Sequence, residues 1–215
     1  MSAEALLKSA VSQRIVPVAV IEHADHAVPA AQALMDGGLN VIEVTFRTAA
    51  AAECIRRIKE ELPEMIVAAG TVLTIDQLKE CMDCGAAFAV APGLNEAVAS
   101  AALDADFPFA PGVMTPTDVE RAHSMGFKTM KFFPAEQAGG ASMVKALLAP
   151  YGHLGISFIP TGGIHSGNCG DYLAIPGVAA IGGSWMIKAD LVSNKDWASI
   201  ASITRDALAN LPSSS

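Results

Sequence analysis

The stretch VIEVTFR at residues 41–47 is followed by AAAAECIRRIKEEL at 49–62 and by IVAAGTVL at 66–73. The outer two are short apolar runs rich in β-branched residues, as in buried strands, whereas the middle one places its apolar residues at helical spacing. A helix that joins two strands through short connections predicts that the strands are parallel and linked by a right-handed crossover.

The same strand-and-helix unit recurs along the chain, with helical spacing also in Thr74–Cys84 and Thr115–Met125. The strand-like runs begin 19 to 28 residues apart and are Ile15–Glu22, Val41–Arg47, Ile66–Leu73, Phe88–Gly93, Phe107–Gly112, Thr129–Ala135, Ser157–Gly163 and Val178–Trp185. Eight such units in 215 residues predict a single α/β domain, residues 1–215, folded as a compact (β/α)₈ TIM barrel. We also expect an extra N-terminal helix over Met1–Val11 and a closing helix over Asn194–Leu211.

The ends of the predicted helices carry capping and stop signals. Thr74 and the pair Thr115-Pro116 are suited to helix N-caps. Gly37-Gly38, Gly85 and Gly126 are suited to helix C-termini.

The alternative fold is a doubly wound open sheet, but the G-x-G-x-x-G that a dinucleotide-binding sheet would carry after its first strand is missing.

Composition and charge limit the classes of partner. Hydrophobic residues make up 52% of the chain and charged residues 17%, so we expect much of it to be buried. The net charge of −8 argues against nucleic acid and anionic membranes, which bind clustered cations. An anionic small molecule in a local pocket remains possible. The sequence shows neither a signal peptide nor an apolar run of about eighteen residues, which predicts a cytoplasmic protein.

Cysteine and histidine spacing favours structural roles. Cys81 and Cys84 form a CxxC, but no second pair completes a zinc site, so we interpret all four cysteines as small buried hydrophobes. The five histidines, including His165, lack metal-ligand spacing. We therefore expect no metal and no cofactor.

Charged residues occur where the interior of the barrel should be apolar. Alternation along residues 41–47 puts Glu43, Thr45 and Arg47 on one face, and the opposite face is apolar and suited to packing under the helices. In residues 129–134, the same alternation directs Lys131 inward together with Phe133. Burial beside Phe133 and the positive field of Arg47 would both disfavour the ammonium form, whereas a nearby Glu43 would oppose this effect. A neutral lysine amine is a nucleophile toward carbonyl groups.

A structural role is the alternative for these charges. A buried ion pair between Glu43 and either Arg47 or Lys131 could satisfy itself without any chemistry. Three inward charges near the carboxyl ends of two strands favour a functional site, because active sites of this fold lie at that face.

Paired glycines close the last two predicted strands. Gly162-Gly163 follows the seventh strand, and Gly182-Gly183 followed by Ser184 closes the eighth. Glycines allow backbone N–H groups to approach an anion closely, and this fold often binds phosphate at these two loops. Thr161 is predicted to point inward between the phosphate loops and the charges.

Taken together, these motifs resemble the 2-keto-3-deoxy-6-phosphogluconate and 4-hydroxy-2-oxoglutarate aldolase family over essentially the whole chain. The resemblance is carried by residues 15–18, 43–48, 69–72, 91–93, 131–136, 160–163 and 182–185. It implies a metal-free lyase, usually a homotrimer, that releases pyruvate and glyceraldehyde 3-phosphate in the Entner-Doudoroff pathway through a Schiff base. The resemblance also implies the following roles: Lys131 as the Schiff-base lysine, Glu43 as the general acid and base, Arg47 for the substrate carboxylate, Thr71, Pro92 and Thr161 as lining residues, and Gly162, Gly163, Gly183 and Ser184 for phosphate.

Two other classes of function remain open at this stage. A phosphosugar isomerase, epimerase or synthase on the same barrel would use the phosphate loops without an imine. A non-catalytic module that binds a phosphorylated ligand would keep Glu43 and Lys131 only as a structural pair.

Overall fold

The computed structural model describes residues 7–8 and 10–211. Strands form within each of the predicted runs, as β1 (Ile15–Ala19), β2 (Val41–Thr45), β3 (Ile66–Gly70), β4 (Phe88–Val90), β5 (Phe109–Ala110), β6 (Gly112–Val113), β7 (Thr129–Phe132), β8 (Ser157–Pro160) and β9 (Ile181–Gly183). The fifth run is split into β5 and β6 at Pro111, which has no N–H to donate to a ladder. The carbonyl of Pro111 still accepts a hydrogen bond from Lys131 N at 2.9 Å.

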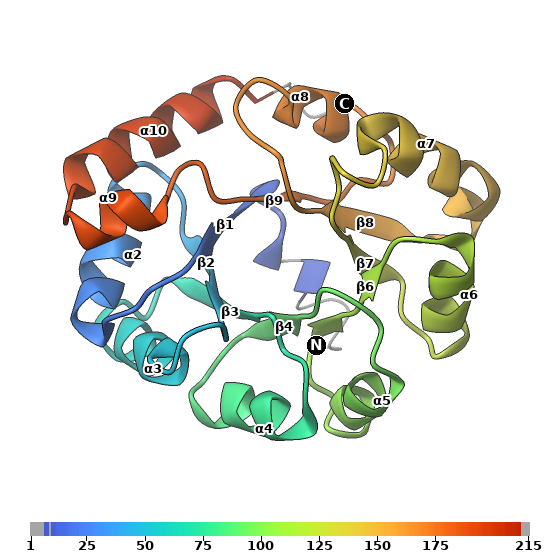
Figure 1. Cartoon of the computed structure of the whole chain (residues 1–215), viewed down its shortest axis with the longest axis horizontal. Helices are drawn as coiled ribbons and strands as arrows, with labels where there is room; N and C mark the ends of the chain where they lie inside the picture. Colours follow the sequence, from blue (N-terminus) through green and yellow to red (C-terminus); the bar gives the residue numbers. More distant parts are fainter. Residues whose placement is uncertain (1–6, 9, 212–215) are drawn as a thin grey trace.

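The strands pair in parallel, as the short crossovers predict. One sheet has the order β5-β4-β3-β2-β1-β9 and the other the order β6-β7-β8. Single parallel bridges, Phe158–Val178 and Thr161–Gly182, connect the second sheet to the chain around β9. Figure 1 shows the helices arranged around the outside of the strands. The molecule is therefore an α/β fold whose curved parallel sheet is covered by helices.

The helices occupy the segments between the strands. They are η1 (Ala24–His26), α2 (Ala27–Asp36), α3 (Ala51–Glu61), α4 (Ile75–Asp83), α5 (Glu96–Asp104), α6 (Pro116–Ser124), α7 (Gly140–Tyr151), η2 (Gly152–Leu154), α8 (Cys169–Leu173), α9 (Ala189–Ser193) and α10 (Trp197–Ala209). The prediction of one closing helix over Asn194–Leu211 was wrong in its start, because the chain turns at Lys195 with a positive φ before α10 begins.

Sequence-predicted caps hold the ends of two helices. The Thr74 side chain accepts a hydrogen bond from Gln77 N at the start of α4. Thr115 and Asp118 form a complete capping box at the start of α6, with Pro116 in the first turn. These caps satisfy free backbone N–H groups in the first turn and so fix where α4 and α6 begin.

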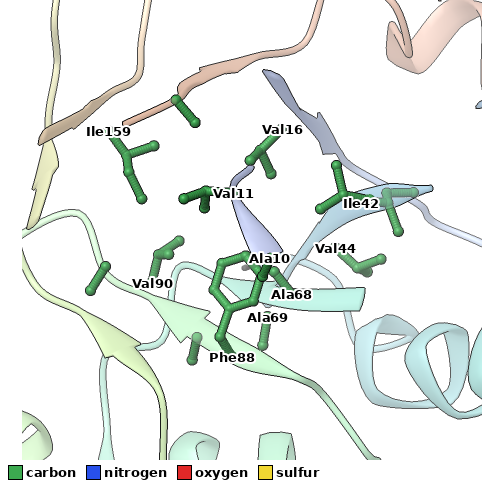
Figure 2. Packing of buried hydrophobic residues seen from close by; sticks show 14 of the residues in the cluster. Ala10, Val11, Val16, Ile42, Val44, Ala68, Ala69, Phe88, Val90 and Ile159 are labelled. Atoms are coloured by element: carbon green, nitrogen blue, oxygen red, sulfur yellow. The ribbon is translucent and has the colours of Figure 1, made fainter. Parts of the chain in front are cut away.

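The core includes the segment that precedes β1. Leu7, Lys8 and Ala10 are helical and Val11 lies in a turn, whereas residues 1–6 and 9 of the helix predicted over Met1–Val11 lie outside the described residues. Ala10 and Val11 are buried, and Figure 2 shows them in the middle of the surrounding strands. Within residues 7–8 and 10–211, no helix combines the length and apolar character needed to cross a bilayer.

Candidate active site

Lys131 and Glu43 face each other from opposite sheets. Lys131 lies in β7 and is in register with Gly112 and Ile159, whereas Glu43 lies in β2. The Nζ atom of Lys131 donates to Glu43 Oε1 at 3.0 Å and to Oε2 at 3.3 Å. Only 6% of the Lys131 side chain and 5% of the Glu43 side chain is exposed. Because both groups are buried, each depends on the other for its polar contact.

Phe133 and Arg47 were both expected to act on the Lys131 amine, and both line the same cavity as Lys131. Phe133 does lie beside the amine, with Nζ 5.9 Å from the centre of its ring. Arg47 donates from Nε to Thr45 Oγ1 at 3.3 Å, and its side chain is exposed. Lys131 Nζ therefore lies between a hydrogen-bonded carboxylate and the ring of Phe133.

A cavity of about 180 Å³ opens next to this pair. Its lining includes the predicted Glu43, Arg47, Thr71, Pro92, Lys131 and Thr161, together with Val18, Thr45 and Phe133. Thr45 and Phe133 were expected to point inward but were not named as site residues. Val18 was missed, although strand alternation along residues 15–19 could have indicated it, because Val18 is in register with Glu43.

A second cavity of about 140 Å³ adjoins the first. It is lined by the predicted Gly162, Gly163, Gly183 and Ser184, and also by Val18, Arg47, Phe133, Thr161, Ile164 and Gly182. Both cavities share Val18, Arg47, Phe133 and Thr161. The paired-glycine loops and the Lys131–Glu43 pair therefore lie along one continuous depression.

The glycines of the second cavity are required by backbone shape and space. Gly162 and Gly163 have φ values of +104° and +75°, a region that L side chains rarely adopt. A Cβ on Gly182 would overlap Thr161 Oγ1. Backbone N–H groups can therefore approach a ligand here more closely than in an ordinary turn.

Thr71 has an unusual backbone for a β-branched residue. Its φ is +61°, in the left-handed region, where a threonine is strained. Thr71 directly follows β3 and lines the first cavity. Strain of this kind often accumulates at sites where the exact direction of a side chain matters.

The cysteines are separate from this depression. Cys54, Cys81, Cys84 and Cys169 are buried free thiols, and Cys84 Sγ donates to Cys81 O at 3.3 Å. Burial raises the pKa of Cys54 to about 11 and raises that of Cys81 further. In the part of the chain that the structure describes, no three His, Cys, Asp or Glu side chains are grouped as a metal site requires.

Comparison with known proteins assigns the chain to a family. Residues 5–203 match the model of the family described as "Aldolase: KDPG and KHG aldolase". The chain is 45% identical over 195 residues to a 2-dehydro-3-deoxy-phosphogluconate aldolase of Haemophilus influenzae, covering 91% of each chain. It is 43% identical over 207 residues to the KHG/KDPG aldolase of Escherichia coli K12, covering 96% of this chain and 95% of that one.

The fold has a close counterpart among solved structures. A KDPG aldolase from Legionella pneumophila, with pyruvate captured as a covalent carbinolamine intermediate, superposes with a TM-score of 0.90 at 35% identity. The match covers 96% of this chain and 98% of that chain. With the family model and the relatives in agreement over nearly the whole length, this chain belongs to the KDPG and KHG aldolase family.

Proposed function

We propose that the chain is a class I aldolase that cleaves 2-keto-3-deoxy-6-phosphogluconate into pyruvate and glyceraldehyde 3-phosphate and also acts on 4-hydroxy-2-oxoglutarate. The observation that carries this proposal is the buried contact of 3.0 Å between Lys131 Nζ and Glu43 at the wall of a cavity. An amine and a proton acceptor in contact, inside a site that excludes most water, supply both groups that imine formation needs.

The first half of the reaction makes the imine. Glu43 accepts a proton from the Lys131 ammonium, and the neutral amine attacks the C2 carbonyl of the substrate. The resulting carbinolamine loses its hydroxyl as water when Glu43 returns a proton, which leaves an iminium ion on Lys131. The positive nitrogen then draws electrons from the C3–C4 bond.

The second half breaks the carbon chain and restores the lysine. Glu43 removes the proton of the C4 hydroxyl, C4 becomes the aldehyde carbon, and the C3–C4 electrons pass into an enamine. Glu43 returns this proton to C3, and water hydrolyses the iminium to release pyruvate. Because Glu43 touches Lys131 through both carboxylate oxygens, one residue is placed to carry every proton.

The ends of the substrate are assigned to the two adjoining cavities. We assign the carboxylate of the pyruvate half to Arg47, with Thr71, Pro92 and Thr161 lining the reacting carbons. We assign the phosphate to the loops that contain Gly162, Gly163, Gly183 and Ser184. Binding the remote phosphate would orient the reacting carbons, so an unphosphorylated substrate should react more slowly.

Trapping of the imine tests the proposal. Borohydride added with pyruvate should inactivate the enzyme and add the mass of one reduced pyruvate to the peptide that contains Lys131. Lys131→Met should show no mass increase and no pyruvate release in a coupled assay. An unmodified, fully active enzyme after borohydride treatment would contradict the proposal and favour an isomerase or a binding module.

The same proposal includes the closure of the barrel, the oligomeric state and the location of the protein in the cell. We infer that residues 1–215 form one domain in which the strands close into a full (β/α)₈ barrel with an N-terminal helix across one end. The bridges between β8 and the chain around β9 support closure at that side. A homotrimer located in the cytoplasm is the accompanying prediction, and light scattering of the purified protein tests its trimeric state.

A further inference from the structure

The segment that follows β7 lies directly on the turn that contains Gly162 and Gly163. Ala135 N donates to Thr161 O at 2.8 Å, and Glu136 N donates to Gly162 O at 3.0 Å. These bonds tie the strand that carries Lys131 to the loop that we assign to phosphate. The shape of the turn therefore depends on the position of residues 135–136.

The side chain of Glu136 packs against this turn at Gly163. A Cβ placed on Gly163 would lie 2.6 Å from Glu136 Cβ and 2.7 Å from its Cγ, so the glutamate stem fills the space beside Gly163. The carboxylate end accepts a short hydrogen bond from the hydroxyl of Tyr172. Glu136 is thus held at its backbone, its stem and its carboxylate.

Tyr172 provides a rigid anchor for that carboxylate. It lies on α8 (Cys169–Leu173), which follows the Gly162–Gly163 turn in the chain, and it is fully buried. Burial, and then the hydrogen bond to Glu136, raise the pKa of the Tyr172 phenol well above its usual value. The hydroxyl therefore stays protonated, and it donates to Glu136 at any pH used for assays.

The charge of Glu136 makes this anchoring important. A carboxylate beside a phosphate site repels the ligand if it turns toward it, and repulsion between like charges is strong at short range. Glu136 does not line the cavity formed by the glycine loops. The bond from Tyr172 therefore holds the carboxylate in a position outside the lining of that cavity.

We propose that Tyr172 and Glu136 are positioning residues that favour phosphorylated substrates, because they fix the Gly162–Gly163 turn and keep a negative charge out of the phosphate cavity. This inference rests on the proposed function, since it assumes that phosphate binds at the turn. The residues touch neither the reacting carbons nor Lys131, so they should affect KM for phosphorylated substrate more than kcat.

Replacement of one hydroxyl tests the inference. Tyr172→Phe should raise KM for 2-keto-3-deoxy-6-phosphogluconate about tenfold, the scale of a lost hydrogen bond to a charged group. KM for 4-hydroxy-2-oxoglutarate, which has no phosphate, should change much less. The Ki of inorganic phosphate as a competitive inhibitor should rise in parallel with the first of these KM values.

The chain offers a matched control for this substitution. Tyr151 donates to Glu120 Oε1 at 2.8 Å in a second tyrosine–glutamate pair, which is exposed and belongs to neither cavity. Tyr151→Phe should leave KM for both substrates and the Ki of phosphate unchanged. Circular dichroism and the Tm of each variant show whether it is folded.

A double variant separates charge from shape. Tyr172→Phe combined with Glu136→Gln removes the released charge, so KM for the phosphorylated substrate should return most of the way to its original value. Equal losses on both substrates, an unchanged KM in folded Tyr172→Phe, or no recovery in the double variant would overturn the inference. Failure of the proposed function is distinct, because the unaltered enzyme would then release pyruvate from neither substrate.

Discussion

Gly70 leaves the space that the carboxylate of Glu43 occupies, since a Cβ on Gly70 would overlap Glu43 Oε1. Gly70 ends β3, and its φ lies outside the left-handed region, so space and not backbone strain makes glycine necessary here. Gly70→Ala should push Glu43 away from Lys131 and lower kcat about a hundredfold, as small misplacements of catalytic groups do. Steady-state assays of pyruvate release measure this loss.

The control for Gly70→Ala is another glycine with free space around it. A Cβ on Gly152 would meet no atom within 4 Å, and Gly152 lies in η2. Gly152→Ala should therefore keep full activity. An equally active Gly70→Ala enzyme would show that Glu43 tolerates displacement, and it would argue against its role in proton transfer.

The Lys131–Glu43 pair should also be visible in folding stability. Lys131→Met leaves the Glu43 carboxylate buried without its ammonium partner, which should lower the free energy of unfolding by about 3 to 5 kcal/mol. Adding Glu43→Leu should recover most of this loss while activity stays absent. Urea denaturation measures both changes.

An exposed ion pair provides the comparison for that experiment. Arg56 contacts Glu53 at 2.5 Å on the surface of α3, with nearly half of each side chain exposed. Arg56→Ala should cost less than about 1 kcal/mol because solvent screens such pairs. If Lys131→Met lowered the free energy of unfolding no more than Arg56→Ala does, the loss of the buried ammonium partner would cost no more than the loss of an exposed one. That result would contradict the prediction.

Much of the fold followed from periodicity alone. Runs such as Val41–Arg47 are apolar, β-branched and separated by helical spacing, and these local signals agree with parallel pairing. Alternation also directed Glu43 and Lys131 to one interior, because a strand sends successive side chains to opposite faces. The paired glycines were recognisable from their places after the last two predicted strands, and two of them, Gly162 and Gly163, do adopt positive φ values.

Other features depend on contacts that periodicity does not encode. The left-handed φ of Thr71 has no counterpart in the alternation of the residues around it. The contact of Glu136 with Tyr172 joins a turn after β7 to α8, 36 positions along the chain. The bond of Arg47 to Thr45 likewise depends on a side-chain conformation that alternation cannot give.

Buried thiols should make the protein less stable at alkaline pH. Burial raises the pKa of Cys54 from 9.0 to about 11, so the folded state binds more protons than the unfolded state between these values. The stability that the buried Cys54 thiol contributes is fully present below pH 9.0 and is lost as the pH rises toward about 11. Urea denaturation across this range should show a smaller alkaline loss for Cys54→Ala; an identical loss would contradict the assignment.

A charge placed in the phosphate cavity should discriminate between substrates. Gly162 lines that cavity with a φ of +104°, and aspartate tolerates a left-handed backbone better than most residues. Gly162→Asp should raise KM for the phosphorylated substrate at least about tenfold through repulsion between like charges. KM for 4-hydroxy-2-oxoglutarate should change far less, because that substrate has no phosphate for the glycine loops to bind.

Gly155 supplies the control for that variant because it shares the backbone but not the site. Its φ is +73°, a Cβ there would meet no atom within 4 Å, and it lies outside both cavities. Gly155→Asp adds the same charge and similar backbone strain, so any selective effect of Gly162→Asp reflects position. The contrary result is that Gly162→Asp and Gly155→Asp raise KM equally for the phosphorylated and the unphosphorylated substrate. The glycine loops would then not be the phosphate site, because only a charge close to the phosphate can affect the two substrates differently.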